Sequence, residues 1–215
     1  MKKIIVSGSI LLVLVIALLI NIDMNNEEKI IEEKSDYNIA DYETAIFAGG
    51  CFWCMEPPFE KLDGVIDAVS GYTGGTLENP TYEQVSSGST KHIEAVKVVY
   101  DAEEISYEEL LDVFWRQIDP TDSGGQFVDR GYQYTSAIFY KTEEEKKLAE
   151  ESLKALEASG RFEEEIVTPI REASEFYNAE EYHQDYYIKS DVKYKYYRSR
   201  SGRDEFLNKV WGNNE

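Results

Sequence analysis

Cysteine and histidine are scarce in this chain of 215 residues, which contains only two of each. His92 and His183 lie far apart in the sequence, and neither stands at a regular spacing from the cysteines. Structural zinc sites usually place their ligands in compact pairs, so this distribution argues against zinc. We therefore predict no metal site and no cofactor, and ordinary hydrogen bonding for both histidines.

Positive charge is also in short supply. The chain has 22 lysines and arginines against 42 aspartates and glutamates, which gives a formal net charge of −20. A surface that binds nucleic acid has to be basic because it must neutralise phosphates, so a nucleic-acid partner is excluded. We interpret the excess of acid as a solvated surface rather than as a site for a cationic partner.

Long apolar runs are absent except near the N-terminus, where residues 4–22 carry no charge. This length is close to the roughly 20 residues that cross a bilayer as a helix. No small-residue cleavage site follows it, so we expect residues 1–22 to be an uncleaved anchor in the lipid bilayer, with a cleaved signal peptide and secretion as the alternative. Lys2 and Lys3 favour a cytoplasmic N-terminal tail, which places the rest of the chain outside the cytoplasm.

The remaining chain divides into a polar tether at 23–43 and one domain at 44–215. In the domain we expect strands at 44–48, 65–72, 92–100 and 136–140. We expect helices after Gly50, at 107–117 with Ser106 as N-cap, and at 142–159 with Thr142 as N-cap. This alternation predicts a layered α/β domain with a largely antiparallel or mixed sheet. The tyrosine-rich tail after Arg161 has weak periodicity and is expected to be irregular with short helices.

Both cysteines are concentrated in one motif, in which Phe52 and Trp53 separate Cys51 from Cys54. A pair at this spacing can form a disulfide or exchange thiols with a partner. The motif follows an apolar strand and two glycines, so Cys51 should sit at a helix N-terminus, where the helix dipole favours the thiolate. Pro57-Pro58 would cost about 3 kcal/mol or more in a helix interior, so we expect a helix that is short and irregular or that starts after Phe52.

Glu94 is the most informative carboxyl group. Strand alternation places it on the same face as Val96 and Val98, which would point it into the core and raise its pKa. A glutamate at a strand end that reaches solvent is an equally good interpretation of the strand alone. The loops around Tyr82, Asp129 and Tyr134 are polar, and a single tyrosine there is more often packing than chemistry.

Several short motifs follow one another along the domain: Gly50-Cys51-Phe52-Trp53, Gly71-Tyr72-Thr73-Gly74-Gly75, Asn79-Pro80-Thr81-Tyr82, His92-Ile93-Glu94, Phe114-Trp115, Asp119-Pro120-Thr121, Asp129-Arg130-Gly131-Tyr132-Gln133-Tyr134 and Tyr182-His183-Gln184-Asp185-Tyr186. Together they resemble the A-type peptide methionine sulfoxide reductases (MsrA). The resemblance covers about residues 44–211 and leaves the apolar run and the tether outside.

This resemblance implies an α/β fold with a ferredoxin-like βαββαβ core and a long irregular C-terminal coil. It implies an oxidoreductase that reduces the S epimer of methionine sulfoxide, free or in proteins, and so repairs oxidative damage. Cys51 matches the family's nucleophile, and Glu94 matches the acid that protonates the sulfoxide oxygen. The other matches are hydrogen-bonding partners of that oxygen (Tyr82, Tyr134), a polar group near it (Asp129) and the apolar wall for the substrate methyl group (Phe52, Trp53).

The chain departs from one common form of the family because it has no cysteine in its C-terminal tail. Cys54 is the only other thiol, so we infer that it resolves the Cys51 sulfenic acid by forming a redox-active disulfide. A thioredoxin-like dithiol would then regenerate the enzyme. If the domain lies outside the cytoplasm, a membrane thiol relay or a tethered thioredoxin-like protein would have to do so.

Two other interpretations use the same cysteine pair. A membrane-tethered thiol–disulfide oxidoreductase would explain Cys-x-x-Cys in an exported domain, but it gives Glu94, Tyr82 and Tyr134 no role. A tethered binding module with a structural disulfide would need no chemistry at all, and it predicts that Cys51 is unreactive toward alkylation.

Overall fold

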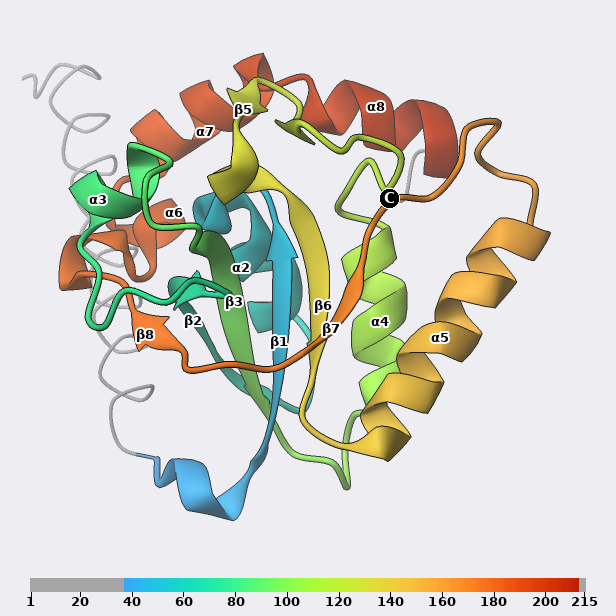
Figure 1. Ribbon diagram of the computed structural model, residues 1–215, viewed down its shortest axis with the longest axis horizontal. Helices are drawn as coiled ribbons and strands as arrows, with labels where there is room; N and C mark the ends of the chain where they lie inside the picture. The colour runs from blue at the N-terminus through green and yellow to red at the C-terminus, as the bar shows by residue number, and fades with distance from the viewer. Residues whose placement is uncertain (1–36, 213–215) are drawn as a thin grey trace, which may run out of the picture. The chain divides into compact units, whose positions relative to one another are not determined.

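The computed structural model describes residues 37–212 (Figure 1). The predicted anchor at 1–22 and most of the predicted tether lie outside these described residues, so both stay predictions. Within 37–212, no helix combines the length and the apolar character that crossing a membrane requires. A short 3₁₀ helix, η1 (Ile39–Asp41), precedes the first strand.

A six-stranded mixed sheet forms the centre of the described residues. Its strands are β1 (Glu43–Gly49), β2 (Val65–Thr73), β3 (Ile93–Tyr100), β6 (Ser136–Tyr140), β7 (Ile170–Glu172) and β8 (Tyr177–Asn178). They lie in the order β7-β6-β1-β3-β2-β8, and every neighbouring pair is antiparallel except β6 and β7. The four predicted strands are confirmed as β1, β2, β3 and β6. The short edge strands β7 and β8 were not predicted.

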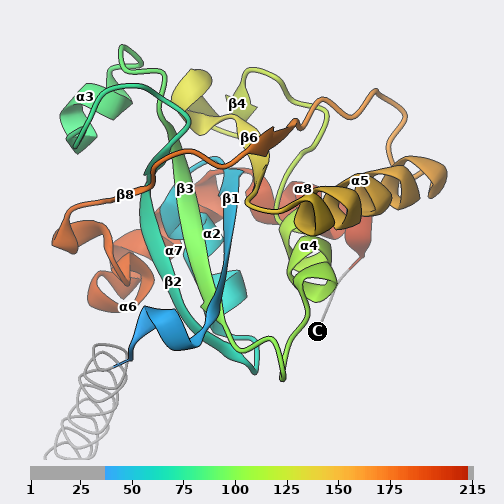
Figure 2. The same cartoon turned by 60° about the horizontal axis from the view of Figure 1, so that its bottom comes forward.

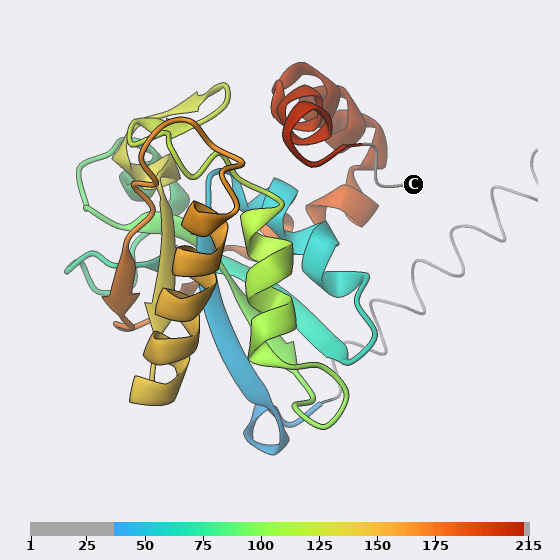
Figure 3. The same ribbon diagram turned by 90° about the vertical axis from the view of Figure 1, so that its right-hand side faces the viewer.

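Helices alternate with the four central strands. With α2 (Phe52–Glu60) and α4 (Tyr107–Trp115), the four strands form a βαββαβ unit with strand order β6-β1-β3-β2. The short helix α3 (Tyr82–Ser86) lies in the connection between β2 and β3. Figure 3 shows α2 and α4 on the same side of the sheet, with α5 (Glu143–Ala158) beside α4. The predicted α/β class is therefore confirmed. Ser106 and Thr142 cap α4 and α5 as expected, each accepting a hydrogen bond from the backbone three residues on.

The two faces of the sheet are covered differently. On the helical face, the Phe47 ring lies 5.3 Å from that of Phe59 in α2 and 5.2 Å from that of Phe114 in α4. On the other face, a smaller apolar cluster around Ile93 and Phe139 is covered by Phe176. Phe176 belongs to the segment that crosses the sheet between β7 and β8 (Figure 1, Figure 2). The main core therefore lies directly behind the helix that carries the cysteines.

Of the two expectations for the first helix, the later start was wrong, because α2 begins at Phe52. The helix is short, with nine residues, and it runs through both Pro57 and Pro58. A proline in a helix leaves the carbonyl four residues earlier without its backbone donor. For Pro58 that carbonyl belongs to Cys54, and the Arg198 Nη1 donates to it at 3.1 Å. A side chain from the distant C-terminal part of the chain thus replaces the bond that the proline removes.

The C-terminal part is less irregular than expected. Only its first stretch, up to Gln184, is mainly coil, with a 3₁₀ turn η3 (Glu181–His183). The chain then forms α6 (Tyr186–Lys189), α7 (Asp191–Arg200) and α8 (Arg203–Trp211). No residue of α7 is fully buried, because its inward side consists of tyrosine and arginine. Such amphipathic side chains give no apolar periodicity, so the sequence predicted short helices in this part without their bounds.

Candidate active site

The turn that places Cys51 depends on two glycines. Gly50 has φ +88°, a conformation that side chains rarely adopt, and a Cβ at Gly49 would lie 2.5 Å from the Met55 Sδ. The chain can therefore leave β1 and enter α2 within two residues. Cys51 is the N-cap of α2, and Cys54 is its third helical residue. The two thiols lie close enough in this first turn to share a hydrogen bond.

The two thiols differ in accessibility and in acidity. Cys51 is 7% exposed and Cys54 is 0% exposed. Burial, with the hydrogen bond to Cys54 and nearby carboxylates, raises the pKa of Cys51 well above its usual value. The same hydrogen bond, followed by the charges of Arg203 and Arg198, lowers the pKa of Cys54 to about 6 against the effect of burial. Cys51 lies at the N-terminus of α2 as expected, but burial opposes the helix dipole and raises the pKa of its thiol, whereas the charges of Arg203 and Arg198 lower that of Cys54.

Glu94 points into the core rather than to solvent, which decides between its two interpretations. It is 1% exposed, and its Oε2 accepts a hydrogen bond from the Phe52 backbone N–H at 3.1 Å. Burial raises the pKa of Glu94 to about 8, against the opposing effect of that hydrogen bond. The negative charge of Asp129 adds to the rise. This carboxyl group therefore holds a proton at neutral pH.

A cavity of about 110 Å³ brings the sequence-predicted residues together. Tyr82 and Tyr134 contribute phenol groups that are hydrogen-bonded to each other. Tyr82 begins α3 (Tyr82–Ser86), and Tyr134 ends the 3₁₀ helix η2 (Tyr132–Tyr134), which immediately precedes β6. The cavity is lined by Cys51, Phe52, Trp53, Tyr82, Glu94, Asp129, Tyr134 and Tyr197. Of the residues named from the sequence, only Cys54 does not line it.

Asp129 reaches the cavity from a small hairpin, β4 (Gly125–Gln126) with β5 (Asp129–Arg130). Its Oδ2 accepts a hydrogen bond from the hydroxyl of Tyr197 in α7. Burial raises the pKa of Asp129, while the Tyr197 hydroxyl opposes that rise. Sequence reasoning missed Tyr197, because it lies among many tyrosines in a helix without an apolar pattern.

The C-terminal segment holds the aromatic wall of the cavity in place. The Trp53 Nε1–H donates to the His183 Nδ1 at 3.1 Å, and the Trp53 indole stacks on Tyr186 with ring centroids 3.8 Å apart. Burial lowers the pKa of His183, so its ring is neutral and can accept that bond. His92 also makes hydrogen bonds, with the Gly75 backbone and the Leu77 carbonyl. The expectation for both histidines is therefore confirmed.

Glu180 is a second residue that the sequence did not reveal. Its carboxylate accepts from the Tyr72 hydroxyl and from the Tyr82 backbone N–H, each at 2.8 Å. Because the two tyrosines belong to β2 and α3, Glu180 joins these elements and fixes the start of the helix that presents the Tyr82 phenol.

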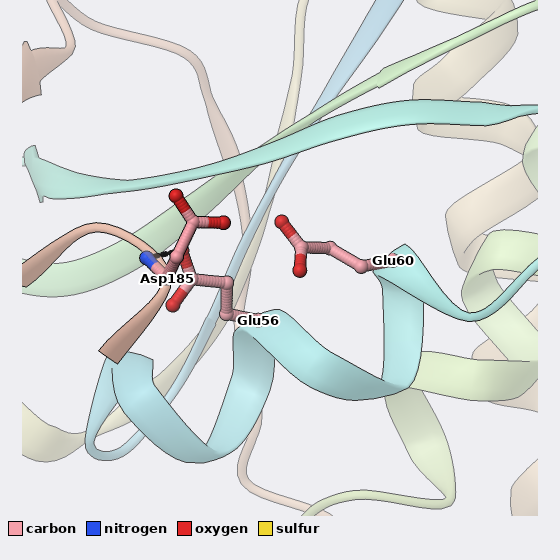
Figure 4. Close-up of side chains that lie close together, drawn as sticks. All are labelled: Glu56, Glu60 and Asp185. Atoms are coloured by element: carbon pink, nitrogen blue, oxygen red, sulfur yellow. Dashed lines mark hydrogen bonds between the residues drawn. The ribbon is translucent and has the colours of Figure 1, made fainter. Parts of the chain in front are cut away.

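Three carboxyl groups gather on another side of α2, those of Glu56, Glu60 and Asp185 (Figure 4). Their oxygens lie within 4.8 Å of one another. The Glu56 Oε1 accepts from the Asp185 backbone N–H at 2.9 Å, where the chain turns with φ +53°. Lys189 lies 3.7 Å from the Asp185 carboxylate. This cluster therefore joins the start of α6 to α2 outside the cavity of Cys51.

Paired thiols beside a proton-holding carboxyl group and two phenols define the site of a thiol-dependent oxidoreductase. Known proteins agree with this class. A model of the family described as peptide methionine sulfoxide reductase matches residues 43–215. The peptide methionine sulfoxide reductase MsrA of Ligilactobacillus salivarius is 57% identical over 169 residues, which are 79% of this chain and 98% of that protein.

The chain is also similar to solved structures, including one of a methionine sulfoxide reductase A. The reduced form of Mxr1 from Saccharomyces cerevisiae is similar with a TM-score of 0.65 and 33% identity, over 73% of this chain and 90% of that one. Methionine sulfoxide reductase A of Corynebacterium diphtheriae is similar with a TM-score of 0.63 and 33% identity, over 71% of this chain and 76% of that one. The chain belongs to the peptide methionine sulfoxide reductase family, as an enzyme of the MsrA type.

Proposed function

We propose that Cys51 reduces the S epimer of methionine sulfoxide, free or in proteins, and that Cys54 resolves the product. The observation that carries this proposal is the single cavity in which Cys51, the protonated Glu94 and the phenols of Tyr82 and Tyr134 meet. Phe52 and Trp53 supply the apolar wall beside Cys51, where a substrate methyl group fits. A thiol–disulfide oxidoreductase would need the cysteine pair but would have no role for Glu94, Tyr82 and Tyr134 beside it.

In the first step, a thiolate attacks the sulfoxide sulfur while Glu94 protonates the sulfoxide oxygen. The hydrogen-bonded thiols share one proton, because the pKa of Cys54 is about 6. As Cys51 attacks, that proton passes to Cys54. Tyr82 and Tyr134 donate hydrogen bonds to the oxygen as negative charge develops on it. The oxygen is transferred with its proton, so the products are methionine and a Cys51 sulfenic acid.

In the second step, Cys54 attacks the sulfur of the sulfenic acid, and the hydroxyl group leaves as water with a proton. The N-cap and third-residue positions already bring the two sulfurs together, so the S–S bond forms at the first turn of α2. The prolines lie beyond that turn and do not separate the pair. A thioredoxin-type dithiol then returns two electrons and two protons to the disulfide.

A direct test is to assay both epimers of a methionine sulfoxide peptide with the wild type and Cys54→Ser. We expect the wild type to turn over the S epimer repeatedly with a dithiol protein as reductant. Cys54→Ser should release about one methionine per enzyme and accumulate the sulfenic acid, because nothing resolves it. Repeated turnover by Cys54→Ser with the same reductant would contradict the resolving role, and consumption of the R epimer would contradict the stereochemistry.

We also propose that residues 1–22 anchor the chain in the bilayer, with the domain outside the cytoplasm. The uncharged stretch 4–22 behind two lysines supports this, and the family match begins only at residue 43. A thioredoxin-like protein or a membrane thiol relay on that side would be the reductant. Alkaline extraction of membranes should leave the full-length chain in the membrane fraction. Complete release into the supernatant would support the alternative of a secreted protein.

A further inference from the structure

The two sulfurs of the cysteine pair are not equally open to an incoming reductant. Cys51 lines the cavity, whereas Cys54 does not line it and is 0% exposed. A thiolate that reduces a disulfide must reach one sulfur from the side opposite the sulfur that leaves. Only Cys51 of the pair lines the cavity, so an approach through the cavity meets the Cys51 sulfur and leaves the departing charge on Cys54.

Two guanidinium groups lie behind Cys54. The Arg198 Nη1 donates to the Cys54 carbonyl at 3.1 Å, which is the carbonyl that Pro58 leaves without a backbone donor. Arg203 is 1% exposed, and its Nη2 donates to the Gly49 carbonyl at 2.9 Å. Both arginines come from the C-terminal helices, and the charges of both lower the pKa of the Cys54 thiol.

From this geometry we propose that the reductant's thiolate attacks the Cys51 sulfur of the Cys51–Cys54 disulfide through the substrate cavity, and that Arg198 positions Cys54 as the departing thiolate. The proposal rests on the proposed function, since it needs that disulfide. It makes Cys51 the attacked sulfur in both the resolving and the regenerating step, whereas Cys54 is the attacking thiol in the first and the leaving group in the second.

The step balances as a thiol–disulfide exchange. The first thiolate of the dithiol forms a bond to the Cys51 sulfur, and the Cys51–Cys54 bond breaks with its electron pair on Cys54. The second thiol of the reductant then loses its proton and attacks the reductant's own sulfur in the mixed disulfide. That attack releases Cys51, which takes up a proton, and the reductant departs as a disulfide.

The acidity of the pair agrees with this direction. A thiol of lower pKa is the better leaving group in disulfide exchange. In the mixed disulfide Cys51 has no thiol proton to donate, but the positive charges of Arg203 and Arg198, which lower the pKa of Cys54, remain. These charges favour the departure of Cys54 as a thiolate.

Trapping the mixed disulfide tests the attacked sulfur. Full-length enzyme is first oxidised with one equivalent of methionine sulfoxide peptide, and the released methionine is measured. A thioredoxin whose second active-site cysteine is replaced by serine is then added, and the adduct is quenched in acid and mapped by proteolysis and mass spectrometry. We expect the adduct on Cys51 and a free thiol at Cys54. An adduct on Cys54, or no adduct from enzyme that has formed its disulfide, would overturn the proposal.

The experiment distinguishes a failure of the proposed function from a failure of the proposed direction of attack. If no methionine is released, the proposed function fails. If methionine is released and the Cys51–Cys54 disulfide forms, but the adduct maps to Cys54, only the direction of attack fails.

Arg198→Met tests the positioning residue. We expect the rate constant for reduction of the disulfide by thioredoxin to fall about tenfold, because Cys54 becomes a poorer leaving group. Arg198→Lys should recover part of the rate, since it restores the charge without the guanidinium geometry. The matched control is Arg116→Met. Arg116 lines the same 540 Å³ surface groove as Arg198 but pairs with Asp112, and its substitution should change nothing in this assay.

The pKa of Cys54 provides a second measurement. It would not change if Arg198 had a purely structural role. In the Cys51→Ser background, adding Arg198→Met should shift the titration of the Cys54 thiolate, followed by its ultraviolet absorbance, to higher pH. Arg116→Met in the same background should leave that titration in place. An unchanged titration, or a wild-type rate of disulfide reduction in Arg198→Met, would remove Arg198 from the mechanism.

Discussion

The βαββαβ core and the C-terminal segment, residues 159–212, contribute to the active site in different ways. All but one of the residues that line the cavity come from the core and its loops. Those groups include the thiol that reacts, the carboxyl group that carries the proton, and both phenols. They reach the cavity from the N-terminus of α2, the beginning of β3, the beginning of α3 and the end of η2.

The C-terminal segment supplies mostly partners for those groups. Tyr197 donates to Asp129, His183 accepts from Trp53, and Arg198 donates to the Cys54 carbonyl. This difference indicates that the core determines which reaction is performed. The C-terminal segment sets the geometry and the charge of the groups that perform it. If this is correct, substitutions in the core should abolish the reaction, and substitutions in the segment should only weaken it.

Cys51→Ser should cause the largest effect, a complete loss of methionine formation, because no other group in the cavity is a nucleophile toward sulfur. The measurement is single-turnover release of methionine from a sulfoxide peptide, so that the loss cannot arise from slow regeneration. Circular dichroism of the variant provides the control for folding. If the variant released more methionine than a sample without enzyme, Cys51 in the core would not be the nucleophile.

Glu94→Gln should lower the rate of the reduction step by about 10²–10⁴-fold, the usual contribution of a general acid. Wild-type single-turnover rates should also fall as pH rises through about 8, where Glu94 loses its proton. Glu94→Gln should lack that fall. A rate for Glu94→Gln within twofold of the wild type would remove Glu94 as the acid.

The same carboxyl group links stability to pH. Its pKa is higher in the folded state than the ordinary value of 4.5, so the folded state retains a proton that the unfolded state releases. The Glu94 contribution to the unfolding free energy is therefore fully present below 4.5 and is lost as pH rises through about 8. Denaturant unfolding at several pH values should show Glu94→Gln gaining stability relative to the wild type on the alkaline side.

These two regions also differ in how far the sequence predicts them. In the core, alternation along β3 placed Glu94 on the face of Val96 and Val98, and the structure confirms that this face is buried. Ser106 and Thr142 marked their helices because side-chain caps act within three residues. Such features depend on local periodicity and local hydrogen bonds, so they can be inferred from the sequence alone.

In the C-terminal segment the controlling interactions are long-range. The path of α2 through Pro58 depends on Arg198, which is 140 residues further along the chain, and the bond from Arg198 to Cys54 spans 144 residues. Glu180 reaches Tyr82 across 98 residues. No local pattern marks either residue, because arginine and glutamate on a surface segment are usually solvated. Their roles appear only when the fold places them beside a carbonyl or an N–H group.

Tyr197→Phe should test the C-terminal segment at its closest approach to the chemistry. It removes the hydroxyl that donates to Asp129, which should raise the pKa of Asp129 further, because that hydrogen bond lowers it. We expect kcat/KM to fall about tenfold, which corresponds to about 1.4 kcal/mol and to one hydrogen bond of a charged group. Tyr196→Phe is the matched control, since the neighbouring side chain is 66% exposed. A loss as large as that of Glu94→Gln would erase the distinction between the two regions.

Glu180→Gln should have the smallest effect. The substitution keeps one acceptor oxygen but replaces the other with an amide, so the Tyr72 hydroxyl or the Tyr82 N–H loses its charged partner. We expect the free energy of unfolding to fall by about 1–3 kcal/mol and KM to rise while kcat changes little, because the Tyr82 phenol becomes less well placed. Glu181→Gln is the adjacent control: its side chain is 86% exposed and pairs with Lys189, an interaction that contributes little at a surface. If Glu180→Gln and Glu181→Gln changed the free energy of unfolding equally in chemical denaturation, Glu180 would contribute no more than an exposed surface charge. The core would then position Tyr82 without help from the C-terminal segment.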